Sequence, residues 1–186
     1  MQRAGIATQR TREPGGSPGA EAIRRLLLDG AADRWDAVSE ALLMTAARRD
    51  HVVRRILPAL AGGNWVVCDR FADSTLAYQG YGRGLPIPEL EALQTFALGD
   101  LRPDLTVILD LPVETGLARA ARRSAADRFE ALDIAFHRRL RAGYQAIAAA
   151  EPERCVVIDA AGDPDAVERA ILATIEPRLG VRLGVA

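Results

Sequence analysis

The chain has 186 residues, of which 49% are hydrophobic and 26% are charged, and its formal net charge is −1. These values are typical of one globular domain, which we place over residues 1–186, and they exclude a disordered chain. A near-neutral charge gives no overall attraction to nucleic acid or to an anionic membrane, so any binding of phosphate must come from local arginine clusters.

The cellular compartment is indicated by the apolar segments and the cysteines. No apolar run approaches the roughly 18 residues of a membrane-spanning helix, and the first residues lack the apolar core of a signal peptide. Cys68 and Cys155 lie within apolar runs without C-x-x-C spacing, which is typical of buried reduced thiols. We therefore expect a cytoplasmic protein with neither a nucleic acid nor a membrane partner.

Short apolar runs alternate with helical patterns along the chain. Strands are predicted at residues 5–11, 65–68, 105–109 and 155–158, and helices at 20–28, 34–60, 88–98, 113–123, 132–150 and 163–179. Continuous apolar strands are typical of a parallel sheet that is covered by helices. The pattern predicts an α/β fold with a doubly wound parallel sheet and helices on both faces.

The first polar segment is Thr11-Arg12-Glu13-Pro14-Gly15-Gly16, between a predicted strand and a predicted helix. A proline-glycine-glycine sequence is typical of a simple chain reversal. It also suits nucleotide binding, because the bare glycine backbone permits close approach of a ligand. Arg12 offers a guanidinium fork to a phosphate, and Glu13 offers an acceptor to a hydroxyl group or to a metal-bound water.

Met44 and Arg48 are four residues apart in the next predicted helix and therefore share one face of it. Taken alone, Met44 suits the protein core and Arg48 suits a solvated surface. A binding role for either residue depends on what surrounds the helix.

A second polar segment, Asp69-Arg70-Phe71, begins where the strand at 65–68 ends. In a parallel sheet this edge carries the ligand-binding residues, although an Asp-Arg pair there also forms local ion pairs. Four polar side chains follow at helical spacing, and their hydroxyl and amide groups can converge on a planar base and a sugar. These residues are Ser74, Thr75, Tyr78 and Gln79.

Four arginines surround the break at residues 124–127 between two predicted helices: Arg119, Arg122, Arg123 and Arg128. Such a cluster is typical of a solvated helix end. The alternative is a mobile lid at about residues 119–130 whose guanidinium groups close over a transferring phosphoryl group.

The segments T-R-E-P-G-G and D-R-F-A-D-S-T-L-A-Y-Q-G, in this order, resemble the thymidylate kinase family, and the resemblance extends from about residue 6 to residue 179. It implies a nucleoside monophosphate kinase fold of the P-loop type. It also implies transfer of the γ-phosphoryl group of ATP to dTMP, which gives dTDP for dTTP biosynthesis, with Mg²⁺ as cofactor. The family forms helix-packed homodimers, which makes the apolar face of residues 34–60 a candidate interface.

The resemblance also implies roles for individual residues. The dTMP phosphate is expected at Arg12, Arg24 and Arg70, and the thymine edge at Arg48, Thr75 and Gln79. Tyr78 is expected beneath the sugar, with Ser74 in the same pocket. Glu13 is expected near the sugar and the metal, which Asp69 and Glu13 would bind through water. The groups expected to act in catalysis are Asp69, Arg70, Arg119, Arg122, Arg123 and Arg128.

Two departures from the family pattern affect these expectations. Met44 stands where the family usually has a phenylalanine that stacks on thymine, and a thioether has no π-face. The sequence contains no lysine, so it has no G-x-x-x-x-G-K-[ST] phosphate loop, and it begins only ten residues before the first motif. We expect that the intact protein is a dTMP kinase whose beginning is missing from this sequence, and that the chain as given is inactive. The missing first strand is central in the family's sheet, so strand edges should be exposed.

Two other functions remain open from the sequence. One is a catalytically dead nucleotide-binding protein that keeps the monophosphate pocket. The other is a kinase for a different deoxynucleoside monophosphate, which Met44 motivates.

Overall fold

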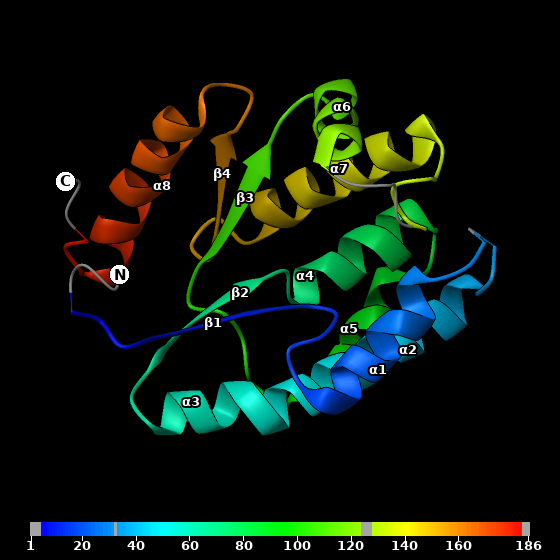
Figure 1. Ribbon diagram of the computed structural model, residues 1–186, viewed down its shortest axis with the longest axis horizontal. Coiled ribbons are helices and arrows are strands. Elements are labelled where there is room, and N and C mark those ends of the chain that lie inside the picture. Colours follow the sequence, from blue (N-terminus) through cyan, green and yellow to red (C-terminus); the bar gives the residue numbers. More distant parts are fainter. Residues whose placement is uncertain (1–4, 32, 124–127, 184–186) are drawn as a thin grey trace.

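The computed structural model describes residues 5–31, 33–123 and 128–183 (Figure 1). In chain order the elements are β1 (Thr8–Arg12), α1 (Pro18–Leu28), α2 (Ala37–His51), η2 (Val52–Ile56), α3 (Leu57–Ala61), β2 (Trp65–Asp69), α4 (Ala72–Thr75), η3 (Leu76–Gly82), α5 (Ile87–Leu98), β3 (Thr106–Asp110), α6 (Val113–Arg123), α7 (Ile134–Ala150), β4 (Cys155–Asp159) and α8 (Pro164–Leu179). The segments η2 and η3 are π-helical. All the strands and helices predicted from the sequence are present, with ends that differ by a few residues.

The strands form two parallel pairs, and within the described residues no ladder joins the pairs (Figure 1). In one pair Thr8 of β1 lies opposite Trp65 of β2, and in the other Thr106 of β3 lies opposite Cys155 of β4. The predicted α/β fold with parallel strands is confirmed. In the part of the chain that the structure describes, strand-to-strand hydrogen bonding is limited to these pairs, and Leu109 on β3 is 49% exposed.

Helices cover both sides of the strands, as predicted. Figure 1 shows α7 and α8 on opposite sides of the β3–β4 pair, and both helices contact β4. Helix α3 contacts β2. Among the described residues, no helix combines the length and the apolar character needed to cross a membrane.

The core is built around the apolar face of α7. Phe136, Leu140 and Ile147 are buried, and Tyr144 packs against them. The helix begins after Asp133, whose carboxylate accepts a hydrogen bond from the backbone N–H of Phe136 at 2.6 Å. This face holds β3, β4 and η3 together, and η3 carries part of the polar segment singled out above.

The segment that follows Asp69 is a helix whose second half widens into the π-helix η3. The sequence predicted ordinary helical spacing here. A π-helix has more residues per turn, and such segments occur frequently at functional sites. The widened turn includes Tyr78 and Gln79.

Candidate functional site

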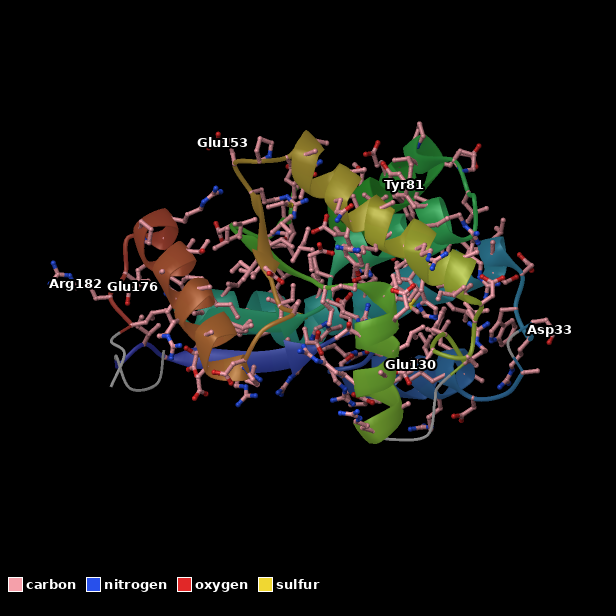
Figure 2. The ribbon with its side chains drawn as sticks, turned by 90° about the horizontal axis from the view of Figure 1, so that it is seen from above. Asp33, Tyr81, Glu130, Glu153, Glu176 and Arg182 are labelled. Carbon is pink, nitrogen blue, oxygen red and sulfur yellow. The ribbon has the colours of Figure 1, made fainter. Side chains whose placement is uncertain are left out.

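A cavity lies where β1 and β2 end, between α1, α2, η3 and the segment before α7. Figure 2 shows Glu130 on that last segment, between α6 and α7. The residues that line the cavity are Glu13, Pro14, Arg24, Leu28, Met44, Arg48, Arg70, Ser74, Thr75, Tyr78, Gln79, Phe129, Glu130 and His137. Most of the substrate-binding residues predicted from the sequence are therefore brought together by the fold.

Glu13 is buried in an ion-paired network at the base of the cavity. Its Oε2 accepts a hydrogen bond from Nε of Arg48 at 2.7 Å, and its Oε1 lies 3.0 Å from Nδ1 of His51. The other ring nitrogen of His51 lies 2.6 Å from the hydroxyl of Thr11. Both carboxylate oxygens of Glu13 are therefore engaged within the protein.

Arg48 connects this network to the polar segment after β2. Its Nη1 donates to the hydroxyl of Thr75 at 2.9 Å, and its Nη2 donates to the backbone carbonyl of Phe71 at 3.1 Å. The Arg48 residue is only 2% exposed. Because three of its five donors are used in this way, the guanidinium is held in a fixed orientation with two donors remaining.

Arg70 differs from Arg48 because it is exposed at the mouth of the cavity. The backbone of Arg70 has a φ of 68°, in the left-handed region. This conformation costs about 1 to 3 kcal/mol for a residue other than glycine, and such residues cluster at functional sites. Its guanidinium carbon lies 5.0 Å from the ring centre of Tyr78. A second cavity begins here, and Arg70, Tyr78, Glu130 and His137 line both cavities.

Beside Arg70, two hydroxyl groups are joined to each other. The Ser74 hydroxyl lies 2.8 Å from that of Tyr144 on α7. Burial raises the pKa of Tyr144 to about 12, so the phenol keeps its proton at neutral pH. This contact fixes the start of the helix that carries Ser74 against α7.

Gln79 is buried beside a charged network that the sequence did not reveal. Its amide nitrogen donates to Oε1 of Glu40 at 2.7 Å. The other oxygen of Glu40 accepts hydrogen bonds from Arg128 and, at 3.3 Å, from Arg83. Glu40 is 0% exposed and Gln79 is 1% exposed.

Four other predicted site residues do not line the cavity. Arg12 is exposed and forms an ion pair with Glu21 at 3.0 Å. The Arg119 guanidinium donates to the carbonyls of Ala160, Ala161 and Gly162, in the loop after β4. Arg122 and Asp69 are exposed.

Two lid arginines remain to be placed. Arg128 is buried against Glu40 and Leu27 rather than open to a phosphate. Arg123 ends α6, but its side chain lies outside the described residues, as does the rest of the predicted lid at 124–127. Arg119 and Arg128 therefore differ from the expectation, because backbone carbonyls and a buried carboxylate hold their guanidinium groups.

A cluster of possible metal ligands adjoins the cavity: Glu13, His51 and Cys68 have ligand atoms within 4.8 Å of one another. Burial raises the pKa of the Cys68 thiol, and the negative charges of Glu13 and Asp69 raise it further, so the thiol keeps its proton. Glu13 and His51 already bind Arg48 and Thr11. We assign no metal to this cluster.

The sequence analysis missed several residues of the cavity and its support. Pro14, Leu28 and His137 line the cavity, and Glu40 binds Gln79. Pro14 lies inside a motif that was singled out, so its position followed from its neighbours. Leu28, Glu40 and His137 lie in ordinary helical patterns, and no local signal distinguishes them from core or surface residues.

Known proteins resemble this chain over most of its length. The sequence profile of the thymidylate kinase family matches residues 1–171. The thymidylate kinase of Caulobacter vibrioides is 61% identical over 171 residues, which are 92% of this chain and 82% of the relative. That of Nitrobacter winogradskyi is 57% identical over 182 residues, which are 96% of this chain and 79% of the relative. The chain belongs to the thymidylate kinase family.

The fold of this family member agrees with a solved structure. The crystal structure of thymidylate kinase from Ehrlichia chaffeensis superposes with a TM-score of 0.73 at 35% sequence identity. The match covers 91% of this chain and 80% of that one. The resemblance expected from the two motifs is therefore confirmed at the level of family and fold, and the chain is a kinase of the transferase class by family.

Proposed function

We propose that the cavity binds dTMP, which in a complete active site accepts the γ-phosphoryl group of ATP and gives dTDP for dTTP biosynthesis. The observation that carries this proposal is that the cavity lining has a charged part and a buried polar part. Exposed Arg70 and half-buried Arg24 supply positive charge, whereas Arg48, Thr75 and Gln79 form a buried polar wall. A nucleoside monophosphate has a matching division between a charged phosphate and a polar base edge.

The buried wall suits the base. Thr75 and Gln79 are each 1% exposed. A ligand that displaces water from this wall must therefore make the hydrogen bonds that the water made with these side chains. Arg48 keeps two donors for the carbonyl oxygens of a pyrimidine. Tyr78 precedes Gln79 in η3, and its ring centre lies 5.0 Å from the guanidinium carbon of Arg70, so we place the sugar at Tyr78. Ser74 and Met44 also line the cavity.

The charged residues suit the phosphate. Arg70 has a bidentate guanidinium fork at the cavity mouth, and Arg24 is oriented by a 2.7 Å hydrogen bond to the carbonyl of Pro14. We assign the phosphate to these two residues. Arg12, which pairs with Glu21 outside the cavity, has no phosphate contact in this proposal.

Asp69 is the residue that fits Mg²⁺ best. Its exposed carboxylate lies at the end of β2, and Mg²⁺ sites use one or two carboxylates together with substrate phosphates. Glu13 fits less well because both of its oxygens are engaged. When bound, Mg²⁺ would neutralise negative charge on the phosphoryl oxygens. Of the lid arginines, we propose that Arg122 and Arg123 approach the transferring group.

ATP turnover by the 186-residue polypeptide is a separate part of the proposal. The sequence has no lysine and therefore no G-x-x-x-x-G-K-[ST] loop to hold the ATP phosphates. We propose that this polypeptide binds dTMP but forms negligible dTDP. A chromatographic assay with ATP, Mg²⁺ and dTMP tests this, and robust dTDP formation contradicts it. Binding without turnover is also what an inert nucleotide-binding protein would show.

The binding proposal is tested by calorimetric titration with dTMP and with thymidine. The wild-type chain should bind dTMP at least roughly tenfold more tightly than thymidine, because charge-assisted hydrogen bonds hold the phosphate. In Arg70→Met the affinity for dTMP should fall towards that for thymidine, whereas the affinity for thymidine should change little. Equal binding of both ligands to the wild type contradicts the assignment of the phosphate.

Acceptor choice is tested in the same titration by adding dUMP and other monophosphates. Met44 lines the cavity where the family usually has an aromatic ring, so we expect it to change the affinity for the base. Tighter binding of another deoxynucleoside monophosphate would favour that compound as the acceptor.

We also propose a cytoplasmic homodimer. Helices α2 and α5 pack together and carry exposed apolar side chains, among them Val38, Leu42 and Phe96. Phe96 is 90% exposed, which is unusual for an aromatic residue of a monomer. A second copy of the chain that packs on this face would cover these side chains.

A further inference from the structure

We infer that Glu40 is a positioning residue that makes the cavity selective for a base with an N–H donor at its pairing edge. It does so by fixing the orientation of the Gln79 amide. This inference rests on the proposed function, because it concerns the base that the cavity accepts.

The orientation of the amide follows from the chemistry of its partner. A carboxylate accepts hydrogen bonds and donates none, so the Gln79 group that lies 2.7 Å from Oε1 of Glu40 must be the NH₂ group. The amide is planar, so its carbonyl oxygen lies on the side away from that NH₂ group. If the Gln79 amide were turned over, its carbonyl oxygen would face Oε1 of Glu40, and two acceptors would oppose each other.

The carbonyl oxygen of Gln79 is accessible from the cavity. Gln79 lines the cavity, and within residues 5–31, 33–123 and 128–183 no hydrogen bond engages its Oε1. This oxygen is also absent from the buried side-chain atoms of the same residues that lack a partner. The base wall therefore presents a fixed acceptor at Gln79.

Two arginines keep Glu40 in its accepting role. Both guanidinium groups donate to Oε2, from Arg128 and from Arg83, and leave Oε1 to Gln79. Arg128 is itself fixed by a 2.8 Å hydrogen bond to the carbonyl of Leu27 on α1. The acceptor in the cavity is thus determined by a charge network outside the cavity.

A fixed acceptor distinguishes between pyrimidines. Thymine and uracil carry a hydrogen on N3, whereas N3 of cytosine is an acceptor with no hydrogen. An N3–H can donate to Gln79, but N3 of cytosine would oppose the carbonyl oxygen and leave two acceptors unpaired. An amide free to turn over would accept either base.

Glu40→Gln tests this directly. The two arginines should hold the carbonyl of the new amide, so its NH₂ group should face Gln79, which would then turn over and present its own NH₂ group to the cavity. Calorimetric titration with dTMP and dCMP gives the selectivity. We expect the ratio of the two affinities to fall by roughly tenfold or more in Glu40→Gln.

The matched control is Asp73→Asn. Asp73 is a buried carboxylate paired with Arg154 at 2.7 Å, and it does not line the cavity. This variant also removes a buried carboxylate charge beside an arginine, but it should keep the wild-type ratio. An unchanged ratio in Glu40→Gln, or an equal fall in both variants, overturns the role of Glu40.

Gln79→Met separates this inference from the proposed function. If the wild type prefers dTMP and Gln79→Met loses the preference while Glu40→Gln keeps it, the proposed function stands and Glu40 has no positioning role. If the wild type binds neither nucleotide, the proposed function itself fails.

A second measurement needs no change at Glu40, in case Glu40→Gln does not fold. Nuclear magnetic resonance resolves the side-chain NH₂ signals of Gln79, which are identified by their loss in Gln79→Met. One proton of the pair should be protected from exchange with water in the free protein, because the NH₂ group donates to the buried carboxylate of Glu40. Rapid exchange of both protons overturns the inference.

Discussion

Glu13 shows how a residue that lines a cavity can act by holding another residue. Its carboxylate is buried between Arg48 and His51, and the side chains of Glu13 and Arg48 are 4% and 3% exposed. Two opposite charges that are buried together need each other, because either one alone would remain unsolvated. Removing either partner would therefore destabilise the fold, and the network also orients the Arg48 guanidinium that lines the cavity.

Arg48→Met should lower the free energy of unfolding by about 3 to 5 kcal/mol, because it leaves Glu13 buried without its guanidinium partner. Arg54→Met is the control, since Arg54 pairs with Asp50 at the surface and its side chain is 65% exposed, so the loss should be about 0 to 1 kcal/mol. Urea denaturation measures both. Similar losses in the two variants would contradict the buried role of Arg48.

At the scale of elements, α7 organises the molecule because it contacts β3, β4 and η3. Close packing against η3 requires a glycine. A Cβ added at Gly143 of α7 would lie 2.7 Å from atoms of Tyr81, closer than real contacts. The position of η3, and with it the base wall, depends on this approach.

Gly143→Ala should therefore destabilise the protein by about 1 to 3 kcal/mol, although alanine favours a helix. Gly116→Ala in α6 is the matched control, because an added Cβ there meets Leu111 at an ordinary 3.9 Å. It should be neutral or should stabilise by up to about 1 kcal/mol. Thermal unfolding of both variants gives the comparison, and a neutral Gly143→Ala would contradict the tight packing.

The end of β3 is tied to α7 by Asp110 and Arg141, whose two hydrogen bonds measure 2.6 and 2.8 Å. The hydrogen bonds from Arg141 lower the pKa of Asp110. Its pKa is thus lower in the folded than in the unfolded chain, so the pair stabilises the fold above the unfolded value of about 4 and loses this effect as the pH falls through the folded pKa.

Asp110→Asn should accordingly be less stable than the wild type at pH 7, and the difference should shrink as the pH falls below about 4. Urea unfolding across this range measures the difference. A gap of constant size at every pH would show that the charge of Asp110 does not contribute.

At the scale of the whole molecule, the apolar face on α2 and α5 is the feature left unexplained by a monomer. Phe96→Glu should convert the proposed dimer to a monomer, because a carboxylate would be buried in the interface. Ile134→Glu on α7 is the control, since Ile134 is 42% exposed and lies on a different helix. Sedimentation velocity distinguishes the species. A wild-type chain that sediments as a monomer would contradict the proposal.

The sequence predicted most of the fold because its strands and helices have strong local patterns. It also predicted most of the cavity lining, since Arg48, Arg70 and Gln79 belong to motifs. It did not predict Glu40, nor the burial of Arg128, because both depend on contacts between distant segments. The widening of η3 was missed for a different reason, since α-helical and π-helical turns share one residue pattern over so short a segment.

The central claim is that one cavity holds the base at Gln79 and the phosphate at Arg70. A crystal structure of the chain with dTMP tests it most directly. We predict the thymine ring against Arg48, Thr75 and Gln79, with its N3–H directed at the carbonyl oxygen of Gln79, and the phosphate between Arg24 and Arg70. Density for dTMP elsewhere on the molecule, or with base and phosphate reversed, would contradict it.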